Sequence, residues 1–80
     1  MNGTDYQFYN KLYNELLKRK RINADKYERE DAFTSIVFEI DDGKNAVQAF
    51  KDVFKAVHEE ELSDAVFNSV YAAVAGFSGR

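Results

Sequence analysis

The chain has 80 residues, of which 45% are hydrophobic, and its formal net charge at pH 7 is −3. Seven Phe and five Tyr supply enough large apolar surface for one small core, so composition argues against a disordered chain. The absence of cysteine excludes disulfide frameworks, thiolate zinc sites and cysteine nucleophiles. No apolar run has the length of a secretory or membrane-spanning segment. We therefore expect a cytoplasmic protein without a membrane role, folded as a single small helical domain over residues 1–80.

Few helix-breaking residues interrupt the chain. It has no proline, and of its four glycines only Gly43 lies far from either end. Such a pattern predicts an all-α protein, a compact bundle of about four short amphipathic helices, with one internal break at Asp41-Asp42-Gly43.

The first predicted helix starts at Thr4, a good N-cap, with Asp5 in its first turn. Its apolar positions recur at helical spacing on one face. These positions are Tyr9, Leu12, Tyr13 and Leu16. The helix then ends in the basic run Lys18-Arg19-Lys20-Arg21, where positive charge is stabilised by the helix dipole.

The second segment admits two interpretations. Asn23 is a suitable N-cap for a helix over residues 24–40 that places Phe33, Ile36, Val37 and Ile40 on one face. Residues 34–40, "TSIVFEI", are also β-branched and aromatic enough for a strand. A lone strand needs a partner for its backbone groups, and no other segment resembles one. We favour the helix, and an α+β fold with a single strand or hairpin around residues 34–40 is the alternative.

Two further helices complete the predicted bundle. Asp41 or Asp42 caps the third, and Glu60 to Ala75 forms the fourth. Gly76 then supplies a left-handed residue after the last helix, and Phe77 folds back on its last turn. The apolar stripe of the third helix comprises Ala46, Val47, Phe50, Val53, Phe54 and Val57. The inward positions of the fourth are Leu62, Val66, Val70, Ala73 and Val74.

Candidate catalytic and metal-binding residues lie close together in one short stretch. His58 and Glu61 resemble a ligand pair, but a strong metal site needs more convergent ligands. Ser63, His58 and Asp64 crowd one turn, whereas a catalytic triad draws its members from separate elements. We therefore expect no catalytic residue, no metal, no cofactor and no small-molecule substrate, and we interpret the chain as a non-enzyme.

Several aromatic residues fall outside the predicted core stripes. Tyr27 and Phe38 lie opposite Ile36 on the second helix, and Phe67 and Tyr71 lie beside the inward stripe of the last. Clustered exposed aromatics mark partner surfaces, unless the second helix is central and buried on both faces. An acidic rim beside them would add electrostatic selectivity. It consists of Glu59, Glu60, Glu61 and Asp64.

The sequence thus favours a small protein-interaction module, such as an inhibitor, adaptor or assembly factor, that binds a protein partner or a second copy of itself. A cysteine-free chain of this size also suits the accessory proteins that phages and mobile elements encode. The alternative is a nucleic-acid-binding accessory protein with a basic surface. Its residues would be Lys11, Lys18, Arg19, Lys20 and Arg21. The negative net charge weighs against that alternative.

Overall fold

The fold consists entirely of helices in the computed structural model, which describes residues 3–78, and the side chains of residues 5–76. Over the described residues the chain forms four helices and no strand, as expected for an all-α bundle. In chain order these are α1 (Gly3–Arg19), α2 (Lys26–Asp41), α3 (Ala46–His58) and α4 (Asp64–Ser78).

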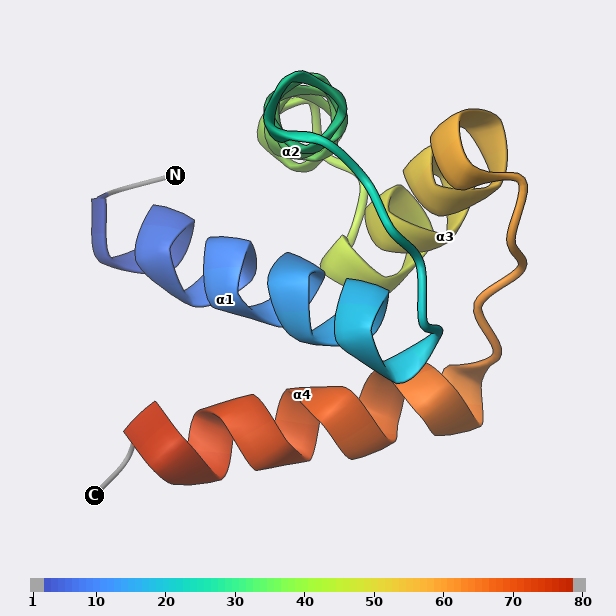
Figure 1. The fold of residues 1–80 in the computed structure, drawn as a ribbon. Coiled ribbons are helices and arrows are strands. Elements are labelled where there is room, and N and C mark those ends of the chain that lie inside the picture. The colour runs from blue at the N-terminus through green and yellow to red at the C-terminus, as the bar shows by residue number, and fades with distance from the viewer. Residues whose placement is uncertain (1–2, 79–80) are drawn as a thin grey trace.

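The helices pack in two pairs. In Figure 1, α4 runs back along α1 in the antiparallel sense, and the two lie side by side. The second pair is α2 with α3, joined by a short corner. Figure 1 shows α2 nearly end-on, so that it crosses α1 steeply on the side away from α4. The radius of gyration is 11.7 Å, about the value expected of a folded chain of this length.

One aromatic-rich core lies between the two pairs and draws on all four helices. Its largest fully buried side chains include Tyr13, Phe50, Phe54 and Phe67. The Tyr13 ring contacts Phe54 edge-on, with ring centroids 5.7 Å apart, and Phe50 lies 5.6 Å from Phe67. These large rings allow a short chain to bury much apolar area without a disulfide.

Residues 34–40 are helical throughout, because they form the second half of α2. The strand alternative for this segment is therefore wrong. The helix begins after Asp25, whose side chain accepts a hydrogen bond from the Glu28 backbone N–H at 2.8 Å. Asn23, the N-cap expected from the sequence, instead lies in the connection between α1 and α2.

The corner between α2 and α3 is built by a left-handed glycine. Gly43 has φ +106°, its N–H donates to the Ile40 carbonyl at 3.1 Å, and the Lys44 N–H donates to the Glu39 carbonyl at 3.0 Å. Asn45 then caps α3 by accepting from the Gln48 N–H at 2.8 Å. The expectation that Asp41 or Asp42 caps α3 is wrong, since both residues belong to the end of α2.

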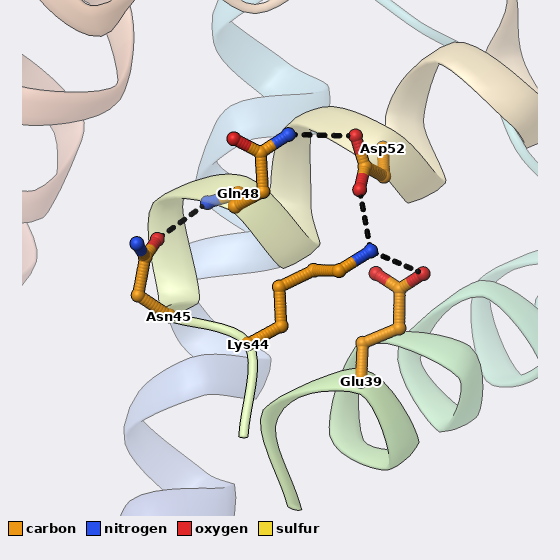
Figure 2. Close-up of polar contacts among 5 residues, drawn as sticks. All are labelled: Glu39, Lys44, Asn45, Gln48 and Asp52. Carbon is orange, nitrogen blue, oxygen red and sulfur yellow. Dashed lines mark hydrogen bonds and ion pairs between the residues drawn. The ribbon is translucent and has the colours of Figure 1, made fainter. Parts of the chain in front are cut away.

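The Lys44 ammonium bridges the two helices at this corner (Figure 2). Its Nζ lies 2.7 Å from Asp52 Oδ2 on α3 and 3.4 Å from Glu39 Oε1 on α2. The hydrogen bond to Asp52 raises the pKa of Lys44, and hydrogen bonds from Lys44 and Gln48 lower the pKa of Asp52. The bridge fixes the C-terminal end of α2 against α3.

The basic run at residues 18–21 forms the end of α1 and the turn after it. The Ile22 N–H donates to the Leu17 carbonyl at 2.9 Å, and the Arg21 N–H donates to the Lys18 carbonyl at 3.1 Å. This is a Schellman ending in which Arg21, with φ 57°, occupies the left-handed position usually taken by glycine. At the other end of α1, the helix begins at Gly3, so Thr4 lies inside it rather than before it.

The last helix starts later and ends later than expected. It begins after Ser63, whose Oγ accepts from the Val66 N–H at 3.2 Å, so Glu60 lies in the preceding connection. Gly76 and Phe77 both lie within α4, so Gly76 does not end the helix as a left-handed residue. The helix continues because glycine inside a helix costs only about 1 kcal/mol relative to alanine. The predicted fold-back of the Phe77 side chain lies outside the described residues.

The inward faces of α3 and α4 differ from the predicted stripes at particular positions. Val57 is 41% exposed, and Ala73 is also exposed. The buried stripe of α4 is formed by Phe67, Val70 and Val74, which recur at helical spacing and face α1. The direction from which α1 packs selects this stripe, and it brings Phe67 into the core.

Candidate protein-binding face

The outward side of α2 carries the two most exposed aromatic side chains among the described residues. Tyr27 is 75% exposed and Phe38 is 69% exposed. They are eleven residues apart, which is about three helical turns, or about 16 Å along the axis and about 20° around it. The two rings therefore stand on one line of the helix. We call this line, with the exposed residues between and beside it, the α2 outer face.

The α2 outer face points directly away from the core. Ala32 and Ile36, on the opposite side of the helix, are fully buried. The alternative in which α2 is central and buried on both faces is therefore wrong, while the expectation that Tyr27 and Phe38 lie opposite Ile36 is confirmed. Between the two rings, Thr34 is small and also exposed. The helix thus presents two exposed aromatic rings with a smaller side chain between them.

Acidic and basic side chains of α2 differ in how far round the helix they lie from this line. Glu30, Asp31 and Asp41 are exposed within about 70° of the line from Tyr27 to Phe38. Lys26 and Arg29 lie further round the helix, about 110° or more from that line. There they line a shallow groove of about 260 Å³ against α1. The groove also contains Asn10, Asn14, Glu30 and Phe33.

Phe67, expected to be a surface anchor, belongs to the core. It is only 2% exposed, and its ring centroid lies 5.6 Å from that of Phe50 and 6.0 Å from that of Tyr71. The expectation that Phe67 is left outside the core is wrong. Phe67 lies to one side of the Val66 stripe, so the periodicity of the sequence places it outside the core. In the structure α1 packs against that side of α4 and covers its ring.

Tyr71 is 41% exposed, but it lies apart from the α2 outer face. Its ring packs edge-on against Phe8 of α1, with centroids 5.1 Å apart. Figure 1 shows α4, which carries it, on the opposite side of α1 from α2. Tyr71 and the pair Tyr27 and Phe38 therefore do not form one aromatic patch.

The expected acidic rim is largely paired with the protein's own lysines. Glu60 lies 3.2 Å from Lys20, Glu61 lies 3.3 Å from Lys55, and Asp64 lies 2.5 Å from Lys51. Only Asp64 lies in the first turn of α4. Glu59 caps the end of α3 in the left-handed conformation, with φ 56°. Most of these carboxylates therefore connect elements of the chain to one another.

The basic residues of the alternative nucleic-acid surface are partly neutralised. Lys18 lies 3.3 Å from Glu15, and Lys20 lies 3.2 Å from Glu60. Lys11, Arg19 and Arg21 are exposed on α1 and at its end. Two of the five charges therefore have carboxylate partners within the molecule.

His58 faces the core rather than a ligand site. Its Nε2 lies 2.5 Å from Tyr13 Oη, and its ring stacks on the Tyr13 ring. Burial lowers the pKa of His58 and raises that of Tyr13 to about 12. Ser63 caps α4 and Asp64 pairs with Lys51. His58, Ser63 and Asp64 therefore each interact with a residue other than the two with which a catalytic triad would join them. No group of three or more metal-ligating side chains forms among residues 5–76.

Sequence reasoning had no local signal for the Tyr13–His58 contact, because the two residues are 45 positions apart. The groove beside Lys26 and Arg29 is likewise formed by two helices and is visible only in three dimensions.

No family model, curated protein or solved structure matches this chain. Within the part of the chain that the structure describes, no helix is long and apolar enough to cross a membrane.

Proposed function

We propose that this protein binds another protein through the α2 outer face, with Tyr27 and Phe38 as its anchors. The observation that carries the proposal is the position of these two rings, which are 75% and 69% exposed on one line of a helix whose opposite side is buried. Aromatic side chains dominate the energetics of protein interfaces because they bury a large, rigid area at low conformational entropy cost.

The framework of α2 supports this role. Asp25 and Gly43 define its two ends, and Lys44 holds its C-terminal end to α3. A face on a helix fixed at both ends loses little conformational freedom on binding, which favours affinity. An inhibitor, an adaptor or an assembly factor would use such a face in the same way.

Photo-crosslinking from two positions tests the proposal. A photoreactive phenylalanine analogue is introduced at Thr34, between the two rings, or at Asn68, an exposed position on α4. In cells of the source organism, a discrete protein adduct is expected from position 34 and not from position 68. An adduct of twice the 9.2 kDa chain would identify a second copy as the partner.

The double variant Tyr27→Ala/Phe38→Ala should abolish the adduct from position 34. Tyr71→Ala is the matched control, because it removes an exposed aromatic ring from α4. Circular dichroism establishes that each variant is folded. Adducts that are identical from both positions, or that survive the double substitution, would exclude the α2 outer face as the binding surface. A nucleic-acid adduct lost on neutralising Lys18 to Arg21 would favour the alternative function.

A further inference from the structure

We infer that the partner bound by the α2 outer face is a cationic segment, a helix with Lys or Arg flanking two apolar side chains about 16 Å apart. This inference rests on the proposed function and adds the chemistry of the partner to it.

The charge of the α2 outer face favours a cationic partner. Glu30, Asp31 and Asp41 are the charged residues of α2 nearest the line from Tyr27 to Phe38, and all three are exposed. Glu30 also pairs with Lys26, whose Nζ lies 3.9 Å from its Oε1. Asp42 follows directly at the end of the helix. Both basic residues of α2 point elsewhere, toward the groove against α1. A partner that covers the two rings therefore meets a net negative charge on α2, to which Asp31, Asp41 and Asp42 contribute.

Helix stability does not explain the acidic residues at the C-terminal end of α2. Asp25 and Glu28 lie at the start of α2, where the helix dipole favours negative charge. Asp42 lies at the opposite end, where the dipole disfavours it, and the last turn of α2 has no basic residue. By contrast, α1 ends in Lys18 and Arg19, as the dipole favours. The C-terminal end of α2 thus carries acidic residues where that of α1 carries basic ones, and the helix dipole does not account for them.

The same negative charge disfavours other occupants of the α2 outer face. In a two-fold dimer through this face, the acidic residues of α2 in one copy would face the same residues in the other copy. Like charges that meet in an interface are strongly unfavourable. Nucleic acid and anionic membranes are repelled for the same reason. A cationic partner is attracted to the acidic residues, and its apolar side chains contact Tyr27 and Phe38 on either side of the small residue Thr34.

Two designed peptides provide the test. Each is an amphipathic helix with a leucine stripe, and its flanking positions are all Lys in one peptide and all Glu in the other. Titration of each into the isotope-labelled protein, followed by amide NMR, locates any binding residue by residue. We expect the Lys peptide to shift the amides of residues 27–38 and the Glu peptide to leave them unchanged.

Charge variants then measure the electrostatic contribution. Asp31→Asn/Asp42→Asn should weaken binding of the Lys peptide at least threefold at low salt, with a smaller difference at high salt. Glu59→Gln/Glu61→Gln is the matched control, since it removes two charges outside α2 and should leave binding unchanged. Tyr27→Ala/Phe38→Ala should abolish binding.

The outcomes separate the two proposals. Equal binding of both peptides to residues 27–38, or no effect of the α2 charge variants, would overturn the cationic partner and leave the binding face standing. If the Lys peptide binds away from α2, or not at all, the cationic partner is also wrong. The crosslink from position 34 then decides the proposed function independently.

Discussion

Tyr13 Oη lies 2.5 Å from Nε2 of His58, and this pair joins α1 to the last residue of α3. Tyr13 is fully buried, and burial raises its pKa to about 12, so its hydroxyl remains protonated and is able to donate a hydrogen bond. Burial lowers the pKa of His58, while the nearby Glu28 carboxylate opposes that effect. The lowered pKa favours a neutral His58, and we assign the tautomer with its proton on Nδ1, in which Nε2 accepts from the Tyr13 hydroxyl.

This arrangement predicts that stability falls in mild acid. Because the pKa of folded His58 lies below its ordinary value, the unfolded chain takes up the proton first as the pH falls. The contribution of neutral His58 is therefore complete above about pH 6.5 and is lost progressively below it. Urea unfolding midpoints should drop between about pH 7.5 and pH 5.5. In His58→Gln the drop over this range should be smaller, and an unchanged drop would show that other groups cause it.

Removal of the donor tests the hydrogen bond itself. Tyr13→Phe should lower the free energy of unfolding by about 1 kcal/mol, the usual contribution of a buried hydrogen bond. It should also raise the pKa of His58, because the hydroxyl stabilises the neutral imidazole. NMR titration of the imidazole protons measures this shift. A pKa of His58 that is the same in both proteins would contradict the assigned direction of the bond.

The Schellman ending of α1 predicts a stabilising substitution. Arg21 adopts φ 57°, a conformation that glycine accepts without steric strain. Arg21→Gly should raise the free energy of unfolding by about 0.5–1 kcal/mol. Arg19→Gly, two residues earlier and inside the helix, should lower it by a similar amount. Chemical denaturation of both variants checks the opposite signs.

Substitution by alanine should have opposite effects on stability at Gly43 and at Gly76. A Cβ at either Gly43 or Gly76 would meet no atom within 4 Å, so only the backbone conformation distinguishes them. Gly43→Ala should destabilise the protein by about 1 kcal/mol because φ is +106°. Gly76→Ala should stabilise it by about 0.5–1 kcal/mol because this residue is helical. Thermal unfolding that moves in the same direction in both variants would count against the α2–α3 corner or the extended α4.

Phe67 and Phe38 should differ in their roles, the first in stability and the second in binding. Phe67→Ala should cost about 3–5 kcal/mol, enough to unfold much of a small domain, because Phe67 is 2% exposed. Phe38→Ala should change stability by less than about 0.5 kcal/mol, because Phe38 is 69% exposed. Denaturant titration separates the two. A large loss of stability in Phe38→Ala would mean that the α2 outer face belongs to the folding core.

Some side-chain positions could be predicted from the sequence, and others could not. The outward positions of Tyr27 and Phe38 were predictable, because Ile36 on the same helix defines the inward direction. The burial of Phe67 was not, because it depends on the side from which α1 approaches α4. The caps Asp25 and Asn45 were not predicted either, because Asn23, Asp41 and Asp42 have equally suitable side chains and lie within a few positions of them.

The sequence by itself determined that the chain forms helices, through its apolar periodicity and its lack of proline, because these properties act within a few residues. Only the tertiary structure decided that Phe67 is buried, which carboxylates pair with lysines, and that Tyr13 contacts His58. Those outcomes depend on contacts between residues far apart in the chain. The position of a side chain on one helix does not specify which neighbour covers it.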